Sequence, residues 1–128
     1  MIDKDKITNQ KPIILIVSPP SDLQIGLQAL LTTYLEVDVY VTSESSSALK
    51  ALARYLPDLV ILDQDLPENS GYEIAREINT NWPETAMLVF VNKDKDRQKF
   101  SLLGVDRTIT KGLPGLELIT EIKTLLQK

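Results

Sequence analysis

Short apolar runs alternate with helical periodicities along this chain of 128 residues. Residues 12–17, 59–62 and 87–91 are nearly continuous apolar runs of strand length, which is typical of parallel strands that are covered on both faces. Residues 37–41 alternate between apolar and polar positions, which predicts an edge strand with one wetter face. Residues 107–110 form a shorter run before Lys111, so the pattern predicts five strands in all.

A helix is predicted after every strand, and the one after the fourth strand is expected to be weakly held. The apolar residues expected to face the core are Leu23, Leu27, Leu30, Leu31, Tyr34 and Leu35, then Ala48, Leu49, Leu52 and Leu56, then Tyr72, Ile74, Ala75 and Ile78, and finally Leu116, Ile119, Ile122, Leu125 and Leu126. Ser21 and Ser70 are each followed three residues later by Gln or Glu, the spacing of a capping box, so we expect both serines to cap their helices. The helix before Gly104 is expected to be short, because residues 92–99 are nearly all polar, and Gly104 suits its C-terminal end.

Alternation of strands and helices predicts an α/β fold with a parallel sheet and right-handed crossovers. We expect the flavodoxin-like strand order 2-1-3-4-5 with helices on both faces, because the chain must reverse its winding once to cover both sides. The carboxyl ends of the strands then share one edge of the sheet. Ser18, Pro19, Asp63, Asn92 and Lys111 lie directly after strands, so we expect them to gather at this edge around the crevice between the first and third strands.

Composition narrows the chemistry that this edge can perform. The chain has no cysteine and no histidine, which excludes thiolate chemistry, serine-type triads and nearly all zinc sites. Its net charge of −4 argues against direct nucleic-acid binding, and it lacks the run of ~18 apolar residues that would indicate a membrane span. We expect a cytoplasmic protein that is not an enzyme, with residues 1–11 as a flexible tail and residues 12–128 as one domain.

Asp63 taken alone is interpreted most simply as a strand-ending acid that caps the following loop. A set of residues at particular distances changes this interpretation, and its members are Asp63, Leu66, Pro67, Gly71, Gly104 and Lys111. Over about residues 12–127 the chain resembles the receiver domain of two-component response regulators. The resemblance implies that Asp63 matches a phosphoryl-accepting aspartate, that Lys111 matches the lysine pairing with that group, and that a histidine kinase is a partner. It also implies a divalent cation held by two acids after the first strand and by the backbone carbonyl of Asp65.

Several residues depart from the pattern of this family. Ser18 and Pro19 stand where the family has its acid pair. Asn92 replaces a hydroxyl residue that rotates toward the phosphate, and Lys93 replaces a small side chain. Thr108 takes the place of the aromatic residue that follows this rotation. These departures affect both the cation site and the switch.

Loss of the acid pair has a direct electrostatic consequence. Phosphoryl transfer to a carboxylate brings two anions together, and a hard cation has to neutralise both. Asp63 and the carbonyl of Asp65 would form a poor cage, so we expect no cofactor and at most weak Mg²⁺ binding. Asp22 is an alternative ligand, although it lies most of a turn too far along the helix. Lys111, with Lys93 as a second candidate, could instead pair with Asp63 directly and hold the pocket in one arrangement.

Three functions remain open from the sequence. The first is an atypical receiver that acts as a phosphorylation-independent protein-interaction module, and the second is a working phospho-acceptor at Asp63 with an unorthodox Mg²⁺ site. The third is a flavodoxin-like pocket for a small ligand, which is disfavoured because the loops contain no glycine-rich phosphate cradle. We expect a signalling protein or a histidine kinase as the partner, or a second copy through the face made by the fourth helix, fifth strand and fifth helix. The charged residues expected on this face are Asp94, Asp96, Arg97, Asp106, Arg107 and Lys123, whose mixed signs suit either isologous pairing or a solvated rim.

Overall fold

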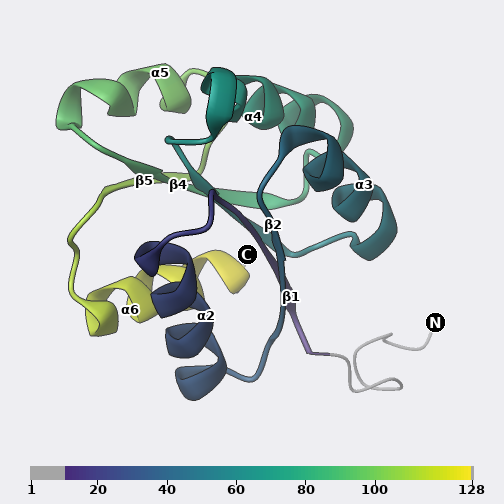
Figure 1. Cartoon of the computed structure of the whole chain (residues 1–128). Helices are drawn as coiled ribbons and strands as arrows, with labels where there is room; N and C mark the ends of the chain where they lie inside the picture. Colours follow the sequence, from purple (N-terminus) through teal and green to yellow (C-terminus); the bar gives the residue numbers. More distant parts are fainter. Residues whose placement is uncertain (1–10, 128) are drawn as a thin grey trace.

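The computed structural model describes residues 11–127, which fold into a sheet between two layers of helices (Figure 1). The strands are β1 (Ile13–Val17), β2 (Asp38–Thr42), β3 (Leu59–Asp63), β4 (Ala86–Val91) and β5 (Arg107–Thr110). They are parallel and lie in the order β2-β1-β3-β4-β5, as predicted. Because β1 pairs with both β2 and β3, the winding reverses at β1, and the crevice opens between the carboxyl ends of β1 and β3.

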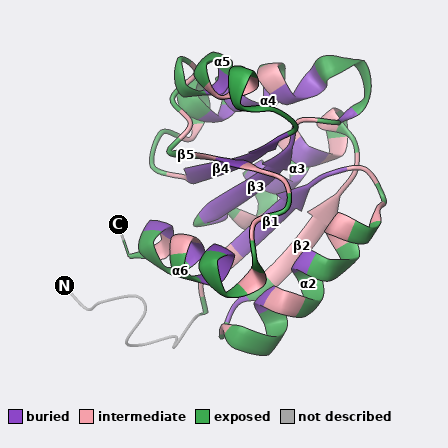
Figure 2. Cartoon of the chain, turned by 90° about the vertical axis from the view of Figure 1, so that its left-hand side faces the viewer, coloured by how far each residue is buried: buried purple, intermediate pink, exposed green. Residues whose placement is uncertain are grey.

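The central strands are apolar because helices cover both of their faces. Every residue of β3 and β4 is buried, which explains why their sequences run without the alternation of a half-exposed strand. By contrast, β2 lies at the edge of the sheet and its residues are intermediate or exposed (Figure 2). The edge position of β2 that its alternating sequence predicts is therefore confirmed.

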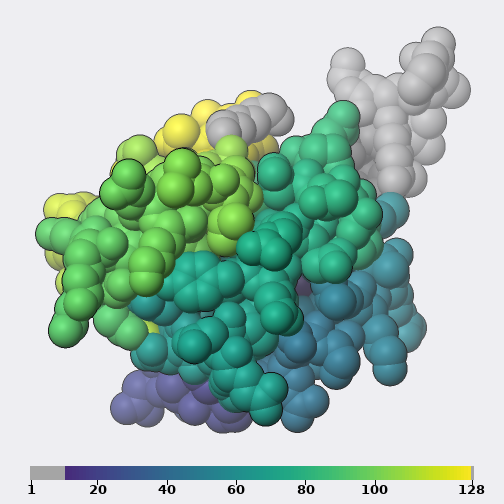
Figure 3. Space-filling model, turned by 90° about the horizontal axis from the view of Figure 1, so that it is seen from above, coloured from purple at the N-terminus to yellow at the C-terminus, as the bar shows by residue number. Residues whose placement is uncertain are grey.

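The helices divide between the two faces of the sheet. They are α2 (Asp22–Tyr34), α3 (Ser45–Tyr55), α4 (Ser70–Asn81), α5 (Arg97–Ser101) and α6 (Gly115–Leu126), with short 3-10 turns η1 (Pro67–Asn69) and η2 (Asp94–Asp96). Helices α2 and α6 pack on one face, and α3, α4 and α5 cover the other (Figure 1). Figure 3 shows the side of the molecule formed by α3, α4 and α5. Each layer has its own apolar core, and alternate residues of the central strands contribute to the two cores.

The two predicted capping boxes differ in outcome. Ser21 caps α2 as predicted, since its hydroxyl accepts a hydrogen bond from the backbone N–H of Gln24. The prediction at Ser70 is wrong. Asn69 stands at the N-cap of α4 in a left-handed conformation, and Ser70 is already the first, buried residue of the helix. The turn η1 supplies the entry to α4 in place of a serine cap.

Three residues predicted to face the core are exposed instead: Tyr34, Leu56 and Leu116. Leu56 has a φ of 47° at the end of α3, so the chain leaves the helix there and the side chain leaves the buried stripe. Leu116 lies in the first turn of α6, where the buried stripe begins instead at Leu118, a residue that the prediction omitted. Tyr34 lies at the last residue of α2, where the helix ends beside solvent.

No helix among residues 11–127 is long and apolar enough to cross a membrane. The predicted flexible tail, residues 1–11, lies outside the described residues except for its last position. The short helix expected before Gly104 is present as α5, and Gly104 follows it with a φ of 83°, a conformation that favours glycine.

Candidate functional site

Asp63 ends β3 at the carboxyl edge of the sheet and is only 3% exposed. The preceding residue, Leu62, is apolar and buried, and Asp63 pairs with Phe90 of β4. A carboxylate in such a place requires hydrogen bonds or an opposite charge to offset its lost hydration. One Asp63 carboxylate oxygen, Oδ1, lies 2.8 Å from Lys111 Nζ and accepts the backbone N–H of Asp65 at 2.9 Å. The buried charge is thus compensated within the pocket.

Lys111 reaches Asp63 because it follows β5, whose carboxyl end lies at the same edge of the sheet. Its backbone N–H still donates to Val91 of β4, which fixes the start of the side chain. The ammonium group contacts two carboxylates, Asp63 Oδ1 at 2.8 Å and Asp65 Oδ2 at 2.7 Å. Burial alone would lower the pKa of Lys111, but the hydrogen bonds and charges of the two carboxylates outweigh it and raise the pKa. Lys111 is therefore charged in the folded protein.

The side chain of Asp65 is a part of the site that the sequence did not predict. The sequence placed Asp65 at the pocket rim and gave a role only to its backbone carbonyl, but the carboxylate bridges Lys111 Nζ and the Asn92 amide, each at 2.7 Å. The hydrogen bond from Lys111, followed by that from Asn92, lowers the pKa of Asp65. The signal for this role was present as a second acid two residues after Asp63.

Asn92 follows β4 and ties this strand to the loop after β3. Its backbone N–H donates to Gln64 Oε1 at 2.8 Å, and its side-chain amide donates to Asp65 Oδ1. Gln64 in turn donates its backbone N–H to the carbonyl of Phe90. Asp63, Asp65, Asn92 and Lys111 therefore form one connected polar network across the ends of β3, β4 and β5.

The end of β1 is neutral and separate from this network. Ser18 is 1% exposed, and its hydroxyl lies 3.2 Å from the carbonyl of Pro19. The side-chain amide of Gln24 donates to the carbonyl and hydroxyl oxygens of Ser18, at 3.0 and 3.2 Å. Gln24 therefore reaches across to β1 instead of folding back to Ser21, which is where a capping box would have placed it. Asp22 is exposed on α2.

The remaining predicted residues lie at the rim. Lys93 is exposed, and among residues 11–127 the cation that pairs with Asp63 is Lys111. Thr108, where the family has an aromatic residue, binds Arg97, whose guanidinium donates to the Thr108 carbonyl at 2.7 Å and to the Thr110 hydroxyl at 2.8 Å. Arg97 also pairs with Asp94 at 3.0 Å and, with a smaller contribution from Thr110, lowers its pKa. A polar clamp thus joins η2 and α5 to β5.

The potential metal ligands are few. Among the described residues, no group of three or more Asp, Glu, His or Cys side chains is arranged to hold a metal ion. At the crevice, Asp63 and Asp65 both face Lys111, whereas the β1 side offers only Ser18, Pro19 and the Gln24 amide. The Lys111 ammonium group therefore occupies the position, between Asp63 and Asp65, from which a metal ion would contact both carboxylates.

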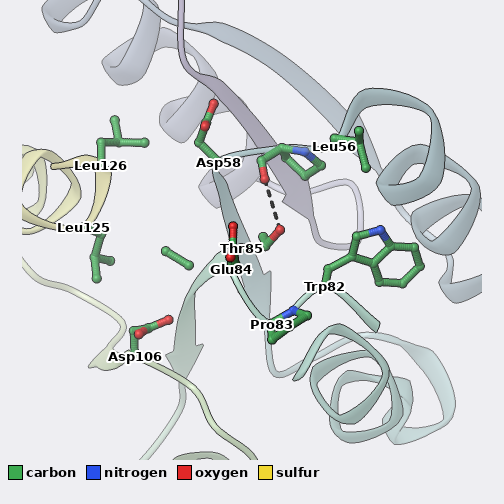
Figure 4. A pocket seen from close by; sticks show the side chains of 11 residues that line it. Leu56, Asp58, Trp82, Pro83, Glu84, Thr85, Asp106, Leu125 and Leu126 are labelled. Carbon is green, nitrogen blue, oxygen red and sulfur yellow. Dashed lines mark hydrogen bonds between the residues drawn. The ribbon is translucent and has the colours of Figure 1, made fainter. Parts of the chain in front are cut away.

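A cavity of about 810 Å³ lies at the opposite end of the sheet, near the amino ends of β3, β4 and β5 (Figure 4). Leu56, Trp82 and Leu126 contribute apolar surface to it, and Asp58 and Asp106 are two of its acids. These two acids have structural contacts, because Asp58 accepts the Ile13 N–H at 2.7 Å and Asp106 accepts the Met87 N–H at 2.8 Å. None of the predicted site residues lines this cavity.

Comparison with known proteins relates this geometry to a family. The model of the family described as response regulator receiver domain matches residues 14–123. The chain is 25% identical over 120 residues to the probable transcriptional regulatory protein TcrX and 28% identical over 115 residues to the DNA-binding transcriptional activator DevR/DosR, both of Mycobacterium tuberculosis. These matches cover 92% and 86% of this chain but 51% and 52% of the two relatives, so the chain spans about half the length of the curated relatives it matches.

Solved structures give the same result. The chain is similar to the signal receiver domain of an HD domain-containing protein from Pseudomonas fluorescens, with a TM-score of 0.85, 26% identity and coverage of 92% of this chain and 88% of that one. It is also similar to the receiver domain of a sensor histidine kinase from Pseudomonas aeruginosa, with a TM-score of 0.82, 20% identity and coverage of 92% and 99%. That structure has a magnesium ion coordinated in the active site cleft, and at 20% identity the likeness concerns the fold alone.

Proposed function

The chain belongs to the family of response regulator receiver domains of two-component systems, and on this premise we propose that its pocket does not switch. In this proposal the domain is a cytoplasmic, phosphorylation-independent binding module. It acts through a fixed surface that a signalling protein recognises, and it performs no catalysis of its own.

The observation that carries the proposal is the ion pair between Asp63 and Lys111 at 2.8 Å in a pocket without the acid pair. Mg²⁺ requires oxygen ligands at near-octahedral positions and gives up its waters reluctantly, so it needs a site that supplies negative charge. Here Asp63 and Asp65 are both bound to Lys111, which cancels one of their two negative charges, and Ser18 and Pro19 supply none. These residues do not fit a magnesium site, and without the cation a phosphoryl donor would meet two carboxylates with one lysine between them.

The ion pair also stabilises a single arrangement of the pocket. Separating a buried carboxylate from its cation leaves the carboxylate without compensation, which costs several kcal/mol, on the order of 3–5. Asp63 is buried, so its carboxylate has little water available as a replacement partner. A ligand that turned Asp63 away from Lys111 would have to offset this cost, which favours a permanently closed pocket.

The surface near α5 and β5 is fixed by a second set of contacts. Arg97 occupies the region beside Thr108, where the family has its mobile aromatic residue, and it is bound to the Thr108 carbonyl, the Thr110 hydroxyl and Asp94. Because three acceptors hold the Arg97 side chain, it is not free to rotate. The region beside Thr108 therefore lacks the rotating side chain that the family uses there. We infer that this face is presented in one state to its partner.

The face suits a protein partner of mixed charge or a second copy of this chain. Beside the Arg97 clamp, Arg107 makes two hydrogen bonds to Glu121 of α6, at 2.7 and 2.8 Å. Alternating positive and negative groups on one surface are self-complementary when related by a two-fold axis. Isologous pairing through α5, β5 and α6 is therefore one mode of assembly within the proposal, and binding to a kinase or another signalling protein is the other.

A working phospho-acceptor at Asp63 is the alternative function. It is favoured by the presence of Asp63 at the end of β3 together with Lys111 within contact distance, which is the pair that the chemistry of the family uses. It requires a divalent cation to bind with few carboxylates, at an unorthodox site.

One experiment separates the two functions. The protein is incubated with acetyl phosphate and Mg²⁺, and its intact mass is measured beside that of the Asp63→Asn variant. We expect no addition of a phosphoryl group to either protein. A phosphoryl adduct that forms on the unaltered protein and disappears in Asp63→Asn would overturn the proposal and establish the alternative.

A further inference from the structure

The loop after β3 turns a second carboxylate back toward the pocket. The backbone N–H of Asp65 donates to Asp63 Oδ1 at 2.9 Å, which tightens the turn two residues after the strand. The carboxylate of Asp65 then lies against groups from two other strand ends, with Oδ2 at 2.7 Å from Lys111 Nζ and Oδ1 at 2.7 Å from Asn92 Nδ2. Each oxygen is bound to a different donor.

This pair of donors has the chemistry of an oxyanion site. An ammonium and a carboxamide N–H, presented from two rigid strand ends, are suited to two oxygens of one tetrahedral or planar anion. Both donors are already bound, and the anion they hold belongs to the protein. The side chain of Asp65 is 53% exposed, so this carboxylate lies on the solvent side of the network, whereas Asp63 is 3% exposed.

Charge counting shows why a second anion would be excluded. Asp63 and Asp65 together carry two negative charges, and Lys111 is the cation that contacts them. A phosphate-like anion approaching Lys111 would therefore meet a pocket that is already net negative. Neutralising Asp65 would leave one carboxylate and one ammonium, and it would release the Asn92 amide and one of the three N–H donors of Lys111.

We propose that Asp65 is a resident anion, which fills the oxyanion site made by Lys111 and Asn92 and excludes small tetrahedral oxyanions from it. Asp65 thereby determines which ligand the receiver pocket holds. This inference rests on the proposed function, because it explains how the Asp65 carboxylate stays bound to Lys111 and Asn92 in a pocket that does not switch. The exposed position of Asp65 makes it replaceable without loss of the core.

The test uses inorganic phosphate as the probe. Wild-type protein, Asp65→Asn and Asp65→Ala are titrated with phosphate at constant ionic strength, and binding is followed by NMR at the Asn92 side-chain amide and the Lys111 ammonium. We expect both variants to bind phosphate at least tenfold more tightly than the wild type, with shifts centred on these two groups. Asp65→Ala excludes the case in which the new asparagine amide is the group that binds.

The matched control is Glu68→Gln. Glu68 is an exposed acid of the same loop, and its substitution removes the same charge as Asp65→Asn does. If Asp65→Asn, Asp65→Ala and Glu68→Gln all bind phosphate as weakly as the wild type, the resident-anion inference is wrong and the proposed function still stands. If the wild type itself binds phosphate at Lys111 and is phosphorylated by acetyl phosphate, the proposed function fails. The Lys111 ammonium signal of the wild type gives a measurement that needs no variant: rapid exchange with water there would contradict a lysine held by two carboxylates.

Discussion

The two halves of the crevice lie side by side on one sheet, but one half is neutral and the other is charged. On the β1 half, Ser18 and Gln24 form a neutral set of hydrogen bonds. On the β3 to β5 half, Asp63, Asp65 and Lys111 form an ion-paired set that also includes Asn92. In a cation-dependent receiver, acids from both halves bind one metal ion. Here the hydrogen bonds and ion pairs described above form within each half.

Under the proposed function, this difference allows Asp63 and Lys111 to stay paired in a pocket that binds no metal. A buried carboxylate requires compensation, and with no acid at Ser18 or Pro19 the cation that compensates Asp63 here is Lys111. The neutral half then needs only dipolar partners, which the Gln24 amide supplies. The comparison between the halves can be tested by altering their charges.

The largest effect is expected from Lys111→Met, which removes the cation of the charged half. Asp63 would then remain buried with no ion pair and with Asp65 beside it, so we expect the free energy of unfolding to fall by about 3–5 kcal/mol. Chemical denaturation followed by circular dichroism measures this loss. Lys93→Met is the matched control, because it makes the same change at an exposed lysine nearby and is expected to alter stability by less than about 0.5 kcal/mol. Equal stabilities of the two variants would contradict the role of the ion pair.

An intermediate effect is expected when the neutral half is given charge. The double variant Ser18→Asp, Pro19→Asp places two carboxylates beside Asp63, so we expect lower stability in chelator and a thermal stabilisation by Mg²⁺ that the wild type does not show. When Mg²⁺ is a hundredfold above its Kd, the gain is about 2.7 kcal/mol. Scanning calorimetry with and without Mg²⁺ measures it. Adding Asp63→Asn should abolish the response, and a response that survives would place the metal elsewhere.

The smallest effect is the contribution of Asp65, which is half exposed and is expected to add less than about 1 kcal/mol. The lowered pKa of Asp65 means that this contribution is present above the unfolded value of ~3.9 and is lost as pH falls through the folded value. The raised pKa of Lys111 means that the same contribution to stability is present below pH ~10.4 and is lost as the pH rises through the pKa of Lys111 in the folded protein. The difference in melting temperature between wild type and Asp65→Asn should therefore be flat from about pH 5 to 9 and shrink outside this range. A difference that grows on acidification would show that another group controls it.

The sequence predicted the sheet order and the positions of the strand-end residues because both follow from strict local patterns. Continuous apolar runs specify buried strands, and a residue that follows such a run is placed at the carboxyl edge by topology alone. For this reason Asp63, Asn92 and Lys111 could be brought together without any structure.

Side-chain direction could not be predicted in the same way. Gln24 has the spacing of a capping box, yet its amide binds the carbonyl and hydroxyl oxygens of Ser18, because the short turn between β1 and α2 places Ser18 within its reach. The Asp65 carboxylate depends likewise on where the ends of β4 and β5 place Asn92 and Lys111. Leu56 was assigned to the core from its helical spacing, but the helix had already ended there. Long-range geometry decides the case of Asp65, whereas the local path of the chain at a helix end decides those of Gln24 and Leu56.

Trp82, which lines the cavity near the amino end of β4, is the only tryptophan of the chain. Because β4 has six residues, Trp82 is separated from the pocket at Asp63 by roughly the length of a strand, ~20 Å. Its intrinsic emission is thus an optical reporter of the far pole of the molecule, and chemical events around Asp63 should leave the spectrum unchanged. A spectroscopist who sees quenching on adding a binding partner would learn that the contact lies at the pole opposite the crevice.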